Sequence, residues 1–195
     1  MKKNIILLLA ALFVANIAAA QRHELRGGYG MLSSNKILNR YTEIIPEFTH
    51  SGKISYGNER STGVYALSYR YKILPRTWFG VGMAYEQVNK TYSYKNESPT
   101  SLRGRNRFFA IAADLQFTYL QVPSGIVTLY GGVSGGAGFL RQRLGGEIDD
   151  TDSVTRFAYQ VSPLGLTVGL PWLGAFAELG IGYKGLVQLG AYVRF

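Results

Sequence analysis

The sequence contains no cysteine, only two histidines, and 12 acidic residues against 21 basic ones among its 195 residues. Without cysteine the chain has no disulfide framework, no thiolate metal site and no cysteine nucleophile. Charged residues make up only 17% of the chain and hydrophobic ones 47%, a mixture too apolar for a disordered protein. The 24 glycines disfavour a helical bundle, because glycine destabilises a helix by about 1 kcal/mol relative to alanine. An ordered, all-β protein is therefore the first expectation.

The first 20 residues have the pattern of a signal peptide. Lys2 and Lys3 precede an apolar run from Ile5 to Val14, and alanines at 18–20 supply small residues before Gln21. The apolar run is shorter than the roughly 20 residues that a membrane-spanning helix needs. We therefore expect export, cleavage after residue 20, and a mature domain of residues 21–195.

Two long stretches lack charge, but their pattern is not helical. Residues 115–140 and 157–177 both contain proline and several glycines, and their apolar residues alternate with small or polar ones. A period of two is typical of β-strands. Pro163 interrupts one alternating segment, where we expect a bulge. The alternation predicts eight strands, at about residues 24–31, 65–72, 79–86, 109–118, 127–139, 156–168, 175–184 and 187–195.

The connections between these strands differ at the two ends. Pro75, Pro123 and Pro171 lie in short turns spaced 48 residues apart, whereas the opposite connections, at residues 33–61, 89–106 and 143–154, are predicted to be longer and polar. A short amphipathic helix is expected within the first of them, at residues 37–45. Short turns at one end and long loops at the other are typical of outer-membrane barrels, whose short turns are periplasmic.

The two faces of each strand differ in polarity. One face carries Leu, Val, Ile, Phe and Tyr, and the other carries Gly, Ala, Ser and Thr with isolated charges. The second face is a poor core for a soluble protein but suits the interior of a barrel surrounded by lipid. An interior this narrow is filled by side chains, so we expect no continuous aqueous pore. We expect the inward charges to pair in one network of Glu24, Arg26, Arg70, Glu86, Asp114, Glu178 and Arg194.

Aromatic residues fall near the strand ends, which predicts two girdles at the membrane interfaces. The girdle near the proline turns contains Tyr69, Tyr71, Trp78, Phe79, Phe117, Tyr119, Trp172 and Phe195. The girdle near the opposite end contains Tyr29, Tyr85, Phe109, Phe139, Phe157 and Tyr183.

With these features the chain resembles the small eight-stranded outer-membrane β-barrel proteins of Gram-negative bacteria over residues 21–195. Its ending, from Leu189 to Phe195, is similar to the C-terminal assembly signal of that family. The resemblance implies an outer-membrane location and implies that the insertion machinery reads Tyr192 and Phe195. The family includes membrane-stabilising barrels, adhesion or defence proteins, channels for hydrophobic compounds and a few lipid A-modifying enzymes, so the fold does not by itself assign a function.

Basic residues gather beside the predicted second and third loops. The guanidinium group suits the phosphates of lipopolysaccharide, although pairing with the acidic loop residues is the alternative. The candidate lipopolysaccharide contacts are Arg103, Arg105, Arg107, Arg141 and Arg143.

The candidates for catalysis and for metal binding are weaker. His50 with Ser51 and Asp149 has the residue types of a hydrolytic site, but nothing in their spacing fixes a geometry. Asp149, Asp150 and Asp152 lack the glycine and glutamate of a calcium loop.

The sequence thus favours a non-enzymatic, porin-like integral outer-membrane protein that is monomeric and has no cofactor or metal. Its expected partners are outer-membrane lipid, lipopolysaccharide and the insertion machinery, and the basic charge lacks any nucleic-acid motif. One alternative is a narrow channel for small hydrophobic molecules, and a second is a lipid A-modifying enzyme.

Overall fold

The computed structural model describes residues 22–33, 54–56, 60–122, 125–145 and 150–195, apart from 95–100. The described part is all-β, and none of its residues forms a helix long and apolar enough to cross a membrane. The strands are β1 (His23–Met31), β2 (Ile54–Tyr56), β3 (Arg60–Leu74), β4 (Thr77–Tyr94), β5 (Ser101–Gln121), β6 (Val127–Gly145), β7 (Asp150–Gly169), β8 (Leu173–Gly182) and β9 (Val187–Arg194).

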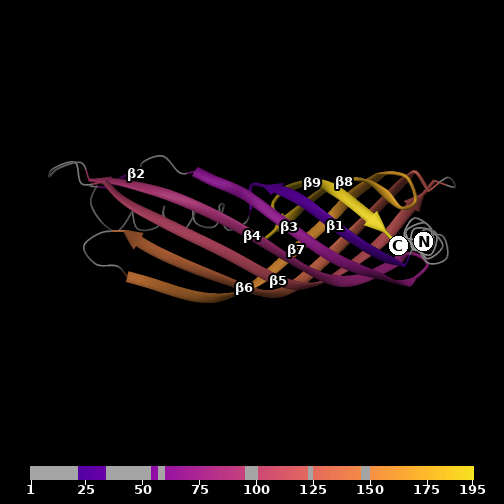
Figure 1. Ribbon diagram of the computed structural model, residues 1–195, viewed down its shortest axis with the longest axis horizontal. Helices are drawn as coiled ribbons and strands as arrows, with labels where there is room; N and C mark the ends of the chain where they lie inside the picture. The colour runs from indigo at the N-terminus through magenta and orange to yellow at the C-terminus, as the bar shows by residue number, and fades with distance from the viewer. Residues whose placement is uncertain (1–21, 34–53, 57–59, 95–100, 123–124, 146–149) are drawn as a thin grey trace, which may run out of the picture.

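Eight of these strands close into a barrel, which confirms the predicted fold class (Figure 1). Each strand of the ring pairs antiparallel with its two neighbours, and the pairing of β1 with β9 joins the first strand to the last. The short strand β2 stands outside the ring and pairs only with the far end of β4. Closure leaves no free edge in the body of the barrel, so its backbone groups are paired without water.

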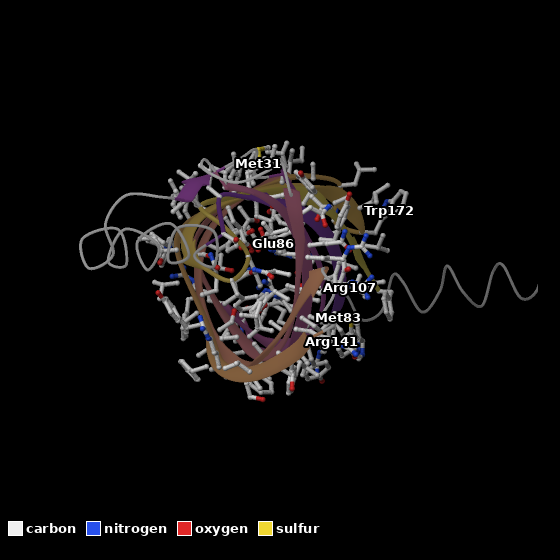
Figure 2. The ribbon with its side chains drawn as sticks, turned by 90° about the vertical axis from the view of Figure 1, so that its left-hand side faces the viewer. Met31, Met83, Glu86, Arg107, Arg141 and Trp172 are labelled. Atoms are coloured by element: carbon white, nitrogen blue, oxygen red, sulfur yellow. The ribbon has the colours of Figure 1, made fainter. Side chains whose placement is uncertain are left out.

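The alternation of each strand separates an apolar exterior from a filled interior. On β3, for example, Tyr65, Leu67 and Tyr69 are exposed while Ser68 and Arg70 are buried. Figure 2, viewed along the barrel, shows Glu86 inside the ring and Met31 and Trp172 outside it. This arrangement is the reverse of a soluble barrel, as the sequence pattern predicts.

The wall of the barrel is much taller on one side than on the other. Strands β4 to β7 have 18 to 21 residues each, whereas β1, β8 and β9 have 8 to 10 (Figure 1). The predicted loops at 89–106 and 143–154 are therefore wrong in extent, because β4 continues to Tyr94, β5 begins at Ser101, β6 continues to Gly145 and β7 begins at Asp150. Hydrophobic alternation stops where the wall leaves the apolar band, but the backbone ladder continues, and only the ladder defines a strand.

The first predicted loop is also shorter than residues 33–61. Strand β2 lies within it and β3 begins at Arg60, while the helix expected at residues 37–45 lies outside the described residues. At the second and third connections the contrast between the two ends of the barrel comes from strand length, because β4 to β7 extend into both of them.

The bulge expected at Pro163 is present. The register of β7 against β8 shifts between Val161 and Leu164, and the register of β6 against β7 shifts at the same level, between Tyr130 and Gly132. Proline has no amide hydrogen to donate to a neighbouring strand. A bulge leaves one residue of the strand unpaired, so the missing donor does not interrupt the ladder.

Candidate functional site: the charged interior and the outer arginine rows

Inward positions of five different strands bring six charged residues into one buried cluster. They are Glu24 and Arg26 from β1, Arg70 from β3, Asp114 from β5, Glu178 from β8 and Arg194 from β9, and none is more than 8% exposed. The residues are up to 170 positions apart in the chain. The closed ring, rather than any local motif, is what makes them neighbours.

Glu24 is the acceptor at one end of the cluster. Its carboxylate accepts a hydrogen bond from Arg26 Nε and another from Arg194 Nε at 2.8 Å, and Arg70 Nη1 lies 3.7 Å from its Oε1. Three guanidinium groups thus surround one buried carboxylate. Their arrangement compensates the cost of removing the charge from water.

Arg26 and Arg70 connect Glu24 to the other two carboxylates. Arg26 Nη1 lies 3.3 Å from Glu178 Oε1, and the Tyr130 hydroxyl donates to the same oxygen at 2.8 Å. Arg70 Nε donates to Asp114, whose other oxygen accepts from Ser134 at 2.6 Å. The interior is therefore a continuous hydrogen-bonded network that crosses the barrel.

Lys184 is a member of this network that the sequence analysis did not include. It lies in the turn between β8 and β9, is 3% exposed, and its ammonium group is 3.3 Å from Asp114 Oδ1. The sequence pattern places Lys184 on the face of Glu178, but the residue lies in a turn beyond β8, so the turn and not the alternation brings it inward. The turn reaches this depth because Gly30 has no side chain, since a Cβ there would lie 1.8 Å from the Lys184 carbonyl oxygen.

Glu86 is buried but stands apart from the other buried charges of the described residues. Its carboxylate accepts hydrogen bonds from Ser33 at 2.6 Å and Ser61 at 2.9 Å. With it, the buried charges of the described residues balance, as four acids (Glu24, Glu86, Asp114, Glu178) face four bases (Arg26, Arg70, Lys184, Arg194). The single network of seven residues predicted from the sequence thus lacks Glu86 and gains Lys184.

Aromatic rings pack over two of the buried arginines, Arg26 and Arg194. Arg26 Cζ lies 4.8 Å from the centre of the Tyr130 ring and 5.1 Å from that of Phe176, and Arg194 Cζ lies 4.4 Å from Tyr192. Cation–π contacts of this kind stabilise a desolvated cation by about 2 kcal/mol.

An apolar layer lies above the charges, toward the tall end of the barrel. Its members touch one another and are no more than 7% exposed: Val64, Ala84, Phe108, Ala110, Ala112, Leu140, Ala158 and Tyr183. This layer has little signal in the sequence, because half of its members are alanines on the small-residue face of β4, β5 and β7. Together with the ion pairs it fills the described interior with side chains.

The aromatic girdle at the tall end is a continuous row across five strands. Register places Tyr29 beside Tyr65, Tyr65 beside Tyr85, Tyr85 beside Phe109 and Phe109 beside Phe139. All five side chains are exposed. From Phe109 to Tyr119 near the proline turn, ten residues rise about 34 Å along a strand, which is about 25 Å at the usual barrel tilt. The separation matches the apolar band of an outer-membrane barrel.

Two residues assigned to the girdles are not part of them. Trp78 and Tyr183 are 5% and 2% exposed, and both lie inside the barrel. Trp78 packs over Arg194 at 5.3 Å. Tyr183 belongs to the inward-folded turn rather than to the strand, so the alternation of β8 no longer applies to it.

The candidate arginines lie immediately beyond the aromatic row. Arg107 of β5 is paired in register with Arg141 of β6, and Arg105 is paired with Arg143. The side chains of Arg105, Arg107 and Arg141 are exposed on the outer face. Arg103 and Arg143 occupy the same alternation in these strands, but their side chains lie outside the described part of the structure.

The C-terminal residues close the seam of the barrel. The backbone of Phe195 exchanges two hydrogen bonds of 2.9 Å with His23, and the two rings stack with centroids 5.6 Å apart. The Phe195 side chain is exposed, whereas Tyr192 points inward and donates from its hydroxyl to the Leu170 carbonyl at 3.3 Å. The two residues of the expected assembly signal therefore face opposite sides of the wall.

Several weaker candidates cannot be assembled from the described residues. His50, Ser51 and Asp149 lie outside them, as do the side chains of Asp150 and Asp152. Among the residues that are described, no group of three histidine or acidic side chains has the arrangement of a metal site.

A closed ring, an apolar outer band bounded by aromatic residues, and a polar, filled interior define a transmembrane β-barrel of the eight-stranded class. No family model and no curated protein matches the chain. Among solved structures it is similar to Ail, the attachment invasion locus protein of Yersinia pestis, in complex with the heparin analogue sucrose octasulfate, with a TM-score of 0.41 and 15% identity. A second Ail structure gives a TM-score of 0.39 and 14% identity, and both comparisons cover 89% of this chain and 93% of the other. The assignment of this chain to the eight-stranded barrels is therefore based on its own closed ring of strands.

Proposed function

We propose that the chain is a non-enzymatic integral protein of the bacterial outer membrane whose arginine rows bind the phosphate groups of lipopolysaccharide. In this proposal the proline turns face the periplasm and the tall wall faces outward. The barrel itself is a scaffold, and the outer leaflet is its first partner. The observation that carries the proposal is the register pair of Arg107 and Arg141 directly beyond the aromatic row.

The height of Arg107 and Arg141 on the wall supports this proposal. Tyr85, Phe109 and Phe139 mark the level at which the apolar band ends, because aromatic side chains favour the membrane interface. The next outward position on each strand carries Gln87, Arg107 and Arg141. Phosphates of lipid A lie at this level of an outer leaflet, so the guanidinium groups are placed at the depth of their ligand.

The positive charge of the two opposed arginines also supports this proposal. Two arginines directly opposite each other on a sheet repel, and such a pair costs about 0.2 to 1 kcal/mol. The register neighbours of this pair on either side are Gln87 and Ser153, neither of which carries a compensating negative charge. A phosphate between the two forks converts the repulsion into charge-assisted hydrogen bonds.

The filled interior supports a scaffold rather than a conduit. A channel for hydrophobic molecules requires an opening, and the Pro163 bulge is the irregular point of the wall. There the Gln160 side chain donates to the Gly185 carbonyl at 3.2 Å and accepts from the Lys184 amide at 2.9 Å. These bonds tie the bulged strand to the inward turn and favour a closed wall at this level.

The test uses the double variant Arg107→Gln with Arg141→Gln, and Arg76→Gln at the opposite end of the barrel as the matched control. The purified barrels are folded in detergent, and lipopolysaccharide is titrated while thermal unfolding is followed by circular dichroism. We expect the double variant to bind lipopolysaccharide at least tenfold more weakly, since each lost phosphate contact is worth about 1.5 to 3 kcal/mol. The control is expected to bind as the unmodified protein does.

Without lipopolysaccharide, the double substitution is not expected to lower the thermal stability of the barrel. The double variant should then be as stable as the unmodified protein or slightly more stable, because a repulsive pair has been removed. Equal binding by both proteins would contradict the proposal, and so would a variant that is less stable even in plain detergent.

A further inference from the structure

The long strands β4 to β7 form the tall wall of the barrel, and the outer ends of its two edge strands, β4 and β7, differ in their pairing. At the β4 edge, β2 pairs with residues Tyr92 to Tyr94 and so continues the sheet. At the β7 edge, pairing with β8 begins only near Tyr159, whose carbonyl accepts from the Tyr183 amide. The earlier residues of β7 pair with β6 on one side and with no described residue on the other.

The backbone groups that face this open edge can be identified. The amide and carbonyl of one strand residue point to the same side, and successive residues alternate. Since Tyr159 points toward β8, the amide and carbonyl groups of Phe157, Thr155 and Ser153 point toward the open edge. Those of Val154 and Arg156 point toward β6, where Leu140 and Gly138 are their register partners. Three donors and three acceptors are therefore presented in strand geometry across the level of the aromatic row, since Thr155 is the register partner of Phe139 and Ser153 that of Arg141.

Apart from the charge of Arg156, the side chains of this edge do not discourage pairing. Natural edge strands are usually protected by proline, by lysine or by a bulge. The segment from Ser153 to Ala158 contains neither residue, its register with β6 is unbroken, and Val154, Thr155 and Phe157 favour strands. Phe157 is 75% exposed, which is the highest value among the exposed large hydrophobic residues.

We propose that the β7 edge from Ser153 to Phe157 binds an extended segment of another protein as an added strand. The partner strand carries an acidic side chain against Arg156, the only charged residue in the segment, and an apolar side chain on the face of Phe157. Main-chain hydrogen bonds provide the affinity and the alternating side chains provide the selectivity. A second copy in the same membrane is disfavoured, because two β7 strands inserted in one direction meet in parallel and cannot form an antiparallel self-pair.

The probe is an end-capped peptide that alternates valine and glutamate, Thr-Val-Glu-Val-Glu-Val-Thr, added to the full chain folded in detergent without lipopolysaccharide. Because no lipid phosphate is present, the outcome is independent of the lipopolysaccharide proposal. Amide hydrogen exchange is followed by NMR. In the free protein we expect protection at Val154 and Arg156 and rapid exchange at Ser153, Thr155 and Phe157. The peptide is expected to slow exchange at the last three by at least tenfold.

Matched variants separate backbone pairing from simple adhesion. Thr155→Pro removes one amide that faces the open edge and leaves the ladder with β6 intact, and it is expected to weaken peptide binding at least tenfold. Thr155→Val keeps the backbone and is expected to bind as the unmodified protein does. A peptide with lysine in place of glutamate, or one methylated on alternate amides, is expected to bind at least tenfold more weakly.

Three results would overturn the proposal. Protection of Ser153, Thr155 and Phe157 in the free protein at low concentration would show that the chain covers its own edge. Protection that appears only on raising the protein concentration would assign the edge to a second copy. Unchanged binding by Thr155→Pro, with normal heat-modifiable mobility on gels, would show that the peptide does not pair with this strand.

Discussion

Replacing Asp114 by asparagine is expected to destabilise the barrel far more than the small change in side-chain size suggests. The carboxylate is 3% exposed, lies 3.3 Å from the Lys184 ammonium and accepts from Arg70 Nε. Asparagine keeps the shape and can still accept from Ser134, but it leaves two buried cations with less compensation. Breaking a buried ion pair from one side costs about 3 to 5 kcal/mol, so the unfolding free energy should fall by that amount.

The matched control is Glu86→Gln. Glu86 is as deeply buried as Asp114, but its described partners are the hydroxyls of Ser33 and Ser61 rather than cations. In glutamine the amide oxygen can accept from one hydroxyl and the NH2 group can donate to the oxygen of the other, so the expected loss is about 1 kcal/mol. A third variant, Asp114→Asn with Lys184→Met, removes one cation together with the anion and should recover part of the loss.

Urea unfolding of the refolded proteins in detergent, followed by circular dichroism and by gel mobility, measures these differences. A loss of less than 1 kcal/mol for Asp114→Asn, or a loss no larger than that of Glu86→Gln, would show that the buried cations do not depend on this carboxylate. A double variant less stable than the single one would show that the Lys184 ammonium stabilises the barrel without needing its anion.

Three further outcomes are expected. Planar bilayers containing the refolded protein should show no large, stable conductance steps, because ion pairs and the apolar layer fill the described interior, and steady steps would refute the filled interior. Gly165→Val should destabilise the barrel by about 1 to 3 kcal/mol, since a Cβ there would lie 2.3 Å from the Tyr130 ring, whereas Gly27→Ala, with no atom within 4 Å, should have little effect on urea unfolding. Deleting Phe195 should sharply lower outer-membrane assembly in cells while the purified protein still refolds, and normal assembly after the deletion would show that this residue carries no targeting information.

Much of the fold could be predicted from the sequence because the two sides of the wall face different surroundings. Leu67 and Tyr69 must meet an apolar medium while Ser68 and Arg70 must not, and a period of two records that requirement in every strand. The same physics located the Pro163 bulge, since a residue without an amide hydrogen interrupts both the ladder and the alternation.

The pairing of the interior was decided by closure of the ring. Alternation indicated that Glu24, Asp114 and Glu178 point inward, but which cation meets which carboxylate depends on the level and the tilt of strands that are far apart in the chain. Lys184 enters the network only because its turn folds inward past Gly30, and Glu86 stays apart because it lies nearer the tall end.

The height of the wall was likewise a matter of tertiary structure. Outside the apolar band neither face of a strand must avoid water, so the sequence of residues 89–106 and 143–154 loses its alternation and looks like a loop. Hydrogen bonds between neighbouring backbones extend β4 to β7 there without any such signal. They create the register pair of Arg107 and Arg141 and the β7 edge with which no described residue pairs. The sequence alone determined which side of each strand faces lipid, because that depends on side-chain polarity; the tertiary structure decided where strands end and which charges meet, because those depend on neighbours that no local pattern specifies.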